Sequence, residues 1–419
     1  MNALEKRVLD AIDTDALLAN LAELIALPSL GGSEGPIQEV MAGLLEDVGM
    51  DVDRWAIDID RLRRHPFYTV EIERSDAIGV VGRMGRGNGP SLILNGHVDV
   101  VPAGDLDRWT VPPWEATITR DRVYGRGAAD MKGGLCCAIA AVRALRDAGV
   151  GLAGSVMIQS VVGEEDGGLG TLAAIERGHT ADAAVVLEPT ELMVAPAQAG
   201  ALNFRIIVRG RAAHGALASE GVDPFDHYLP LYRAMRQFER QRNSGITDPM
   251  FADYETPFAL CIGKLQSGIW ASTVSEELTC EGRLGIGVHE KSEVVRAEFS
   301  RAIEHAAAAD PWLHEHPPVV EWWGAQFEPA SIPSDHPLVT TLVDAHQSVA
   351  EKAPVLRGMP YGADMRLLVN QGRIPTLLYG PGNVRHAHAP DEFVPIADLE
   401  TASQVIALSV LRFCGGSVR

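Results

Sequence analysis

Three apolar segments of this chain each end in ionisable side chains, and this pattern constrains the fold more than any other feature. The segments have the composition of buried strands and cover Leu92–Leu94, Val156–Val162 and Ala183–Leu187. The side chains that follow them are His97 and Asp99, Glu164 and Glu165, and Glu188. Because the carboxyl ends of the strands in an open parallel sheet surround the ligand crevice, we expect these groups to converge. The pattern predicts an α/β fold with a mostly parallel sheet, and a divalent cation that relieves the repulsion among the acids.

The set of potential ligands is large enough for two cations. Two ions need one bridging carboxylate and about one histidine and one further acid each, with an open position for water. Asp130 is the candidate bridge. The other candidate ligands are His97 and Glu188 for one ion, and Glu165 and His388 for the second. Such a site activates water for the hydrolysis of an amide and holds the oxyanion that develops.

Two residues have predicted roles beside the ligands. Successive side chains of an extended strand face opposite ways, so Glu164 and Glu165 cannot both ligate one ion from a strand. At a strand-to-loop corner, Glu165 can ligate while Glu164 addresses the water, which makes Glu164 the candidate general base. Asp99 lies two residues beyond His97, on the same side of the strand, and can accept the second imidazole proton.

The charge and composition of the chain exclude several classes of protein. Its 36 basic and 56 acidic residues give a formal net charge of -20, which repels nucleic acid and anionic membrane surfaces. The five cysteines are too few and too unevenly spaced for a disulfide framework, so we expect reduced thiols. The first 30 residues have no apolar core of signal-peptide length, and no segment reaches the roughly 20 apolar residues of a membrane span. We therefore expect a cytoplasmic protein.

The pattern of apolar residues changes in the middle of the chain. Four segments carry this change, with strand-like alternation at residues 202–208 and 278–286 and helical spacing at residues 225–238 and 294–303. They predict an antiparallel sheet with two helices on one face, in a separate domain inserted at residues 199–316. Residues 1–198 and 317–419 would together form the catalytic, metal-binding domain.

Five blocks of sequence, taken in order, resemble a known family. They are Asn95–Pro102, Gly125–Gly134, Gly163–Glu165, Glu188–Thr190 and Ala387–Glu392. The chain resembles the zinc-dependent deacylases and exopeptidases that include acetylornithine deacetylase, succinyl-diaminopimelate desuccinylase, aminoacylase and carboxypeptidase G. The blocks span most of the chain and are highly specific together, although no single block is.

The resemblance implies two zinc ions per subunit, held by the ligands assigned above, with Co²⁺ or Mn²⁺ as substitutes. It implies that the inserted domain is an α+β, ferredoxin-like two-layer sandwich that acts as a lid and forms a homodimer. Glu188 stands where family aminopeptidases tend to carry aspartate, which favours deacylase or carboxypeptidase chemistry. The resemblance also implies a cis peptide bond after Asp130.

The resemblance further indicates residues that act on the substrate. His214, in a motif of the lid, matches a histidine that reaches the partner subunit's site and stabilises the oxyanion. Arg366 matches an arginine that grips a substrate carboxylate through its bidentate fork. Ser272 stands where many relatives carry asparagine and could donate one hydrogen bond. Arg283 is a further candidate for contact with a carboxylate.

Several of these residues have a plainer explanation. A single acid or histidine at a strand end is more often capped, paired or exposed than bound to metal, and only the ordered blocks together favour ligation. His386 lies two positions before His388 and competes with it as a ligand, although the register of the block selects His388. His214 could be a surface or helix-capping histidine, and Arg366 could pair with Asp364.

The sequence therefore predicts a cytoplasmic, homodimeric, metal-dependent amidohydrolase. It would hydrolyse the amide bond of an N-acyl amino acid or a related small amide through water activated by two zinc ions, with Glu164 carrying the proton. The alternative enzyme is a metallo-exopeptidase that acts as a dipeptidase or carboxypeptidase. The third alternative is a non-catalytic amino-acid-binding protein of the same fold, which the loss of Glu164 or of a ligand would have favoured, and none is lost.

Overall fold

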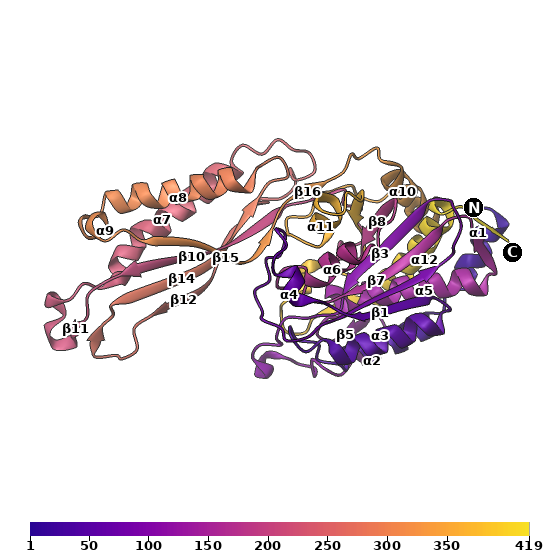
Figure 1. The fold of residues 1–419 in the computed structure, drawn as a ribbon, viewed down its shortest axis with the longest axis horizontal. Coiled ribbons are helices and arrows are strands. Elements are labelled where there is room, and N and C mark those ends of the chain that lie inside the picture. The colour runs from indigo at the N-terminus through magenta and orange to yellow at the C-terminus, as the bar shows by residue number, and fades with distance from the viewer. Residues whose placement is uncertain (419) are drawn as a thin grey trace. The chain divides into compact units, whose positions relative to one another are not determined.

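A six-stranded sheet forms the centre of the first of two units in this computed structural model, which describes residues 1–418 (Figure 1). The first unit contains Met1–Ala197, Ala330–Arg357 and the chain from Ala363 onward. The second unit contains Gln198–Pro329 together with Gly358–Gly362. The chain therefore leaves the first unit and returns to it.

The sheet of the first unit is mostly parallel. Its strands, in spatial order, are β1 (Asp51–Ala56), β2 (Ile78–Met84), β7 (Ser155–Val161), β3 (Ser91–His97), β8 (Ala183–Val186) and β17 (Thr376–Leu378). The last four of these strands run parallel to one another, whereas β2 is antiparallel to both β1 and β7. Every residue of β7 is buried, including the apolar stretch Val156, Met157 and Ile158, as expected for a strand that is covered on both faces. The α/β fold predicted from the sequence is confirmed.

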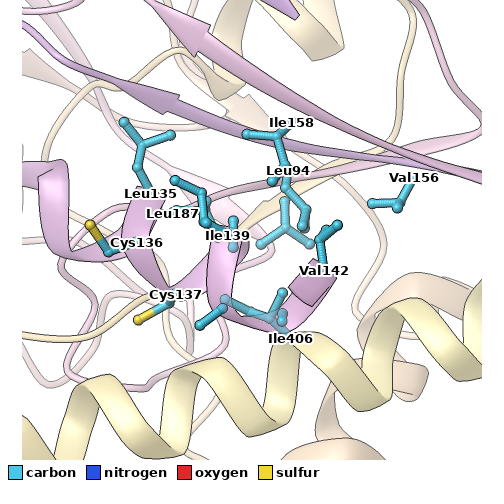
Figure 2. Packing of buried hydrophobic residues seen from close by; sticks show 14 of the residues in the cluster. Leu94, Leu135, Cys136, Cys137, Ile139, Val142, Val156, Ile158, Leu187 and Ile406 are labelled. Atoms are coloured by element: carbon cyan, nitrogen blue, oxygen red, sulfur yellow. The ribbon is translucent and has the colours of Figure 1, made fainter. Parts of the chain in front are cut away.

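Helix α5 (Gly133–Asp147) lies between this sheet and α12 (Ile396–Phe413). Figure 2 shows its side chains packed among Leu94 and Ile158 of the strands and Ile406 of α12. The helix is buried over most of its surface, which suits its alanine-rich sequence, and its charged residues Arg143, Arg146 and Asp147 are not among the buried ones. Its two cysteines, Cys136 and Cys137, are buried packing residues.

The remaining elements of the first unit surround this core. The helices are α1 (Ala3–Asp10), α2 (Thr14–Ile25), α3 (Gly35–Asp47), α4 (Ile59–Leu62), α6 (Leu169–Arg177), α10 (Pro337–Ala350) and α11 (Met365–Asn370). Short strands form two small sheets, with β4 (Thr117–Ile118), β5 (Arg122–Tyr124) and β18 (Phe393–Pro395) in one, and β6 (Val150–Leu152) and β19 (Gly416–Val418) in the other. Within residues 1–418, no helix combines the length and apolar character needed to cross a membrane.

The second unit is a two-layer α+β structure. Its antiparallel sheet has the order β12 (Leu260–Ser267), β14 (Glu277–Ile286), β10 (Gly200–Arg209) and β15 (Val319–Phe327). Figure 1 shows the two long helices on one face of this sheet, α7 (Pro224–Asn243) and α8 (Ser292–Ala308). The predicted strand alternation lies in β10 and β14, where alternate side chains are buried against the helices.

The second unit extends past residue 316, where the sequence analysis ends the inserted domain. A short helix, α9 (Pro311–Glu315), lies at this boundary and precedes β15. Because β15 pairs with β10, it belongs to the sheet of the second unit. A small ribbon of the same unit, β11 (Ala213–His214) paired with β13 (Thr273–Val274), carries one predicted site residue.

Candidate metal centre

The carboxyl ends of three parallel strands lie beside one another and bring the predicted groups together. His97, the last residue of β3, pairs with Val161, the last residue of β7. On the other side of β3, Asn95 pairs with Val186, the last residue of β8. The segments that leave β7 and β8 therefore begin next to His97. These segments carry Glu164, Glu165 and Glu188.

Asp130 lies between two histidines. Its Oδ1 is 3.1 Å from Nε2 of His97, and its Oδ2 is 3.6 Å from Nε2 of His388. On the His97 side, Oε1 of Glu188 is 3.9 Å from the same nitrogen. On the His388 side, Oε2 of Glu165 is 3.1 Å from Nε2. Each oxygen of Asp130 thus faces one imidazole and one further carboxylate, a mixture of nitrogen and oxygen donors that fits two divalent cations such as Zn²⁺.

The segment that carries Asp130 is held by a buried carboxylate from far along the chain. Asp130 lies in a tight turn at Ala128–Lys132, and the bond between Asp130 and Met131 is cis, as the resemblance implies. Oε1 of Glu392 accepts hydrogen bonds from the backbone N–H groups of Ala129 and Asp130, at 3.0 and 3.1 Å. Its Oε2 accepts a 2.5 Å bond from Arg126. These contacts fix the orientation of the candidate bridge.

His97 is oriented by the main chain of Asp99. Nδ1 of His97 lies 2.9 Å from the carbonyl oxygen of Asp99 and 3.8 Å from its carboxylate, so the acceptor differs from the one we expect from the sequence. The carbonyl accepts a hydrogen bond from Nδ1–H and so fixes the proton there, which leaves the lone pair of Nε2 to face the cluster and bind a cation. The carboxylate of Asp99 instead accepts hydrogen bonds from the backbone N–H groups of Glu164 and Glu165, at 3.2 and 3.0 Å. The different acceptor arises because the chain turns after β3 and redirects the side chain.

Glu164 lies within reach of the same centre. Its carboxylate is buried, and its oxygen lies within 4.8 Å of ligand atoms of His97 and Glu188. It belongs to a turn that we call the glutamate loop, Gly163–Gly168, which connects β7 to α6. The loop is the strand-to-loop corner that lets the side chains of Glu164 and Glu165 face one centre. A carboxylate in this position can take a proton from water bound at the centre.

The electrostatics of the cluster favour cations. Burial raises the pKa of Glu188 and of Glu164 well above their usual range, and repulsion from neighbouring carboxylates adds to this effect. Burial alone would lower the pKa of His388, but the carboxylate of Glu165 outweighs it and raises the pKa to about 9. The raised pKa values show that burial and mutual repulsion oppose several negative charges at one centre. Divalent cations would supply the missing positive charge.

His388, and not His386, faces the cluster. The ring of His386 packs on Phe393, with the ring centroids 4.2 Å apart. His388 is half exposed, and its backbone lies in the left-handed region at a φ of 58°. A residue other than glycine in this region is uncommon, and such residues concentrate at functional sites. The geometry agrees with the register of the sequence block.

Three predicted substrate residues lie in the second unit. His214 is exposed, and its Nδ1 accepts a 3.1 Å hydrogen bond from the backbone N–H of Ala216, so it caps the short helix that follows. Ser272 is exposed in the neighbouring loop, and its carbonyl accepts a 2.7 Å bond from Gly215. Arg283, on β14, donates to the carbonyl of Pro360 at 3.3 Å, and burial lowers its pKa. The structure thus brings His214 and Ser272 together, and their action on a substrate stays a prediction.

Arg366 lies in the first unit, at the start of α11, and is buried. Its Nη2 donates a 2.8 Å hydrogen bond to the carbonyl of Gly167, in the glutamate loop. The neighbouring Asp364 is also buried and accepts a 2.6 Å bond from Thr171. Contact with a substrate carboxylate stays a prediction for Arg366, whereas its contact with the loop is observed.

The sequence analysis did not single out a buried ion-pair group beside the centre. Arg74 bonds to both Glu34 and Asp166, and all three side chains are buried. Asp166 directly follows Glu165, which is the one local signal for its importance. Arg74 lies 92 residues before Asp166, and Glu34 lies 40 residues before Arg74, both in segments without a recognisable motif. Only the fold shows that they meet.

A family model and two named relatives match this chain over most of its length. The model of peptidase family M20/M25/M40 matches residues 93–412. The chain is 28% identical, over 409 residues, to the N-formyl-4-amino-5-aminomethyl-2-methylpyrimidine deformylase of Bacillus subtilis (strain 168), a match that covers 92% of this chain and 91% of the deformylase. It is 25% identical over 337 residues to a probable succinyl-diaminopimelate desuccinylase of Staphylococcus aureus (strain MRSA252), covering 75% and 81% of the two chains.

Solved structures show the same fold. A dipeptidase from Saccharomyces cerevisiae, Dug1p, is similar with a TM-score of 0.79 at 14% identity, and the match covers 98% of each chain. At this identity the likeness speaks for the fold alone. The family model, in contrast, covers about three quarters of this chain, including every candidate cation ligand. The chain belongs to peptidase family M20/M25/M40 and is a metal-dependent hydrolase.

Proposed function

We propose that this hydrolase is a deacylase that cleaves the amide bond of an N-acyl amino acid or a related small N-acyl amide. The observation that carries the proposal is the position of Asp130, whose two oxygens face His97 and His388, beside the buried carboxylate of Glu164. Two relatives that match most of the chain support acyl removal over peptide cleavage, because they are named as a deformylase and a probable desuccinylase.

The cation ligands in this proposal are the five residues predicted from the sequence, His97, Asp130, Glu165, Glu188 and His388. They would hold two ions of Zn²⁺, with Co²⁺ or Mn²⁺ as substitutes, and Asp130, which faces both histidines, would be shared between the two positions. When bound, the cations polarise the scissile carbonyl and lower the pKa of the attacking water. The imidazole and carboxylate donors around Asp130 support this assignment.

The protein groups then carry the proton and hold the site in place. Glu164 takes a proton from the attacking water and delivers it to the nitrogen of the leaving amine, so that one carboxylate serves as base and then as acid. Asp99 keeps His97 in the required tautomer through its carbonyl and orients the main chain at Glu164 through its carboxylate. These two roles therefore need both the main-chain carbonyl and the side-chain carboxylate of Asp99.

The second unit has a proposed role in substrate binding. We assign it the part of lid and dimer interface in a cytoplasmic homodimer, with His214 of one subunit stabilising the oxyanion in its partner's site. The hydrogen bond that Nδ1 of His214 accepts supports this role. Because Nδ1 is an acceptor, the neutral ring carries its proton on Nε2, which can then donate a hydrogen bond to the oxyanion. Ser272 adjoins His214 and is the candidate for a further hydrogen bond to the substrate, while Arg283 and Arg366 are the candidates for a carboxylate.

A substrate panel tests the proposed reaction. Protein of known zinc content would be offered N-formyl, N-acetyl and N-succinyl amino acids, an N-formyl amine without a carboxylate, and dipeptides. We expect at least one N-acyl compound to be cleaved with a kcat/KM about 10-fold or more above every dipeptide, a difference of about 1.4 kcal/mol in transition-state binding. Faster cleavage of dipeptides would favour an exopeptidase instead. Tight binding without cleavage at every zinc loading would favour the non-catalytic alternative.

A further inference from the structure

The glutamate loop, Gly163–Gly168, is rich in glycine, the residue that constrains the backbone least. Gly163, Gly167 and Gly168 adopt φ values of 69°, 139° and 78°, in the region that favours glycine. These three glycines surround the two glutamates that the centre needs. Because glycine gains the most conformational freedom when a segment loosens, the loop requires contacts from outside to hold Glu164 and Glu165 in place.

Arg74 supplies such contacts from a distant segment of the first unit. Its Nη1 and Nη2 donate to the two oxygens of Asp166, at 2.8 and 2.7 Å, in a bidentate pair. Its Nε and Nη2 donate to Oε1 of Glu34 at 3.1 and 2.6 Å, and Nη1 also donates to the carbonyl of Ile72 at 3.2 Å. All three nitrogens of the guanidinium are therefore used. Glu34 holds the guanidinium while the guanidinium holds Asp166.

The backbone next to Arg74 reinforces this contact. The N–H of Ile72 donates to Oδ2 of Asp166 at 2.8 Å, and the N–H of Glu71 donates to the carbonyl of Asp166 at 2.8 Å. The guanidinium also lies over Gly163, where an added Cβ would come within 3.0 Å of Nη2. Arg74 thus touches the loop both before and after the two glutamates.

We propose that Arg74 is a positioning residue for the reaction, acting through Asp166 to hold the carboxylates of Glu164 and Glu165 at the cation centre. The arrangement has the features that positioning requires. The guanidinium is planar and matches both oxygens of a carboxylate, so it fixes direction as well as distance. The group is buried, so water does not compete for its bonds. The inference rests on the proposed function, since it assigns Arg74 a part in placing the base.

The test compares Arg74 with another arginine of the first unit that pairs with an acid away from the centre. Arg412 donates to Glu5 at 2.8 Å between α12 and α1, neither of which carries a candidate ligand. The variants are Arg74→Lys and Arg74→Ala, with Arg412→Lys and Arg412→Ala as matched controls. For each variant we would measure kcat and KM, the affinity for Zn²⁺ by competition with a chelator, and the midpoint of thermal unfolding.

We expect Arg74→Ala to lower kcat about 10- to 100-fold and to weaken Zn²⁺ binding. Losses of this size are typical when a residue that orients a metal ligand is removed. KM should change little. Arg74→Lys should keep the charge but lose the fork, and should recover only part of the activity. Millimolar guanidinium should restore kcat in Arg74→Ala, by filling the vacated site between Glu34 and Asp166, and should have no such effect in Arg412→Ala. The Arg412 variants should retain the wild-type kcat.

Two results would overturn the inference. One is a kcat per folded molecule in Arg74→Ala equal to that in Arg412→Ala. The other is guanidinium that raises the unfolding midpoint of Arg74→Ala without raising kcat. If Arg74→Ala does not fold, Asp166→Asn removes the same charged pair from the other side and should lower kcat in the same way. A Glu164→Gln variant measured alongside separates the two ideas. Wild-type turnover in that variant contradicts the proposed role of Glu164, on which the inference rests. The expected large loss of turnover in Glu164→Gln, together with an unaffected Arg74→Ala, contradicts only the positioning role.

Discussion

The side chain of Asp99 accepts a hydrogen bond from the backbone N–H of Glu165 at 3.0 Å. Its other oxygen accepts one from the N–H of Glu164 at 3.2 Å, and its main-chain carbonyl lies 2.9 Å from Nδ1 of His97. Through different atoms, one buried residue therefore holds both the candidate ligand at the end of β3 and the loop that carries the candidate base. Loss of the Asp99 carboxylate should therefore disturb the loop that carries Glu164 and Glu165.

Asp99→Asn should reduce activity or zinc affinity strongly while the protein remains folded. Asparagine keeps one oxygen but turns an amide N–H₂ toward a second N–H donor, so one buried backbone group loses its partner. We expect a loss of about 1–3 kcal/mol in unfolding free energy and about a 10- to 100-fold loss of activity or zinc affinity. Asp182→Asn is the matched control, because its exposed carboxylate also accepts from a backbone N–H, that of Ser91 at 2.7 Å. Equal activity losses in the two variants would contradict the role of Asp99.

Glu164→Gln should separate catalysis from cation binding. The substitution preserves the shape of the side chain and removes its capacity to take a proton. We expect kcat/KM to fall by about 10²- to 10⁴-fold, while metal analysis finds the wild-type zinc content. Glu165→Gln provides the contrast, since a lost ligand should reduce the zinc content as well. Wild-type turnover by Glu164→Gln would exclude it as the base.

Cations should stabilise the folded chain. The carboxylates at the centre lie close together and are buried, and a divalent ion that binds only the folded state relieves their repulsion. At a free Zn²⁺ concentration 100 times its dissociation constant, the gain is about 2.7 kcal/mol per site. Calorimetric scans of chelator-treated protein with added Zn²⁺ would measure it. In Glu188→Gln the increase in unfolding midpoint should be smaller, and an equal increase would place the ions elsewhere.

A pH dependence of stability is expected in the second unit, far along the chain from the candidate ligands. Burial raises the pKa of Asp310, but hydrogen bonds from the N–H of Leu313, from His227 and from the N–H of Trp312 outweigh it, so the pKa lies below its usual value. For an acid with a lowered pKa in the folded state, the stabilisation is present above the unfolded value of about 3.9 and is lost as pH falls through the folded value.

Asp310→Ala tests this dependence. Because Asp310 caps α9 by accepting from the N–H groups of Trp312 and Leu313, its loss should lower the unfolding free energy by about 0.5–2 kcal/mol at pH 6. The difference from the wild type should shrink in urea unfolding experiments below pH 3.9. Asp310→Asn should retain most of the cap and lose only the charged contact with His227. A difference that is constant with pH would show that ionisation of Asp310 does not contribute.

Local sequence patterns predicted the chemistry and the main layers of this protein. Acids at the ends of apolar runs predict a parallel sheet with a cation site, because strand ends in such a sheet always face the same side. The side chains that converge are the predicted ones, from His97 to His388. Local periodicity likewise predicted the antiparallel sheet and its two helices in the middle of the chain. These features depend on neighbours in sequence or on rules that hold for every strand of a given type.

The contacts that hold the site in place, in contrast, depend on how the whole chain packs. The direction of the Asp99 carboxylate depends on how the chain turns after β3, and the extent of the second unit depends on the pairing of β15 with β10. Arg74 and Asp166 meet across 92 residues, and no local pattern marks either as the partner of the other. The physical reason is that a hydrogen bond or ion pair needs two groups within about 3 Å, and for groups so far apart in sequence that distance is set by the packing of the whole unit.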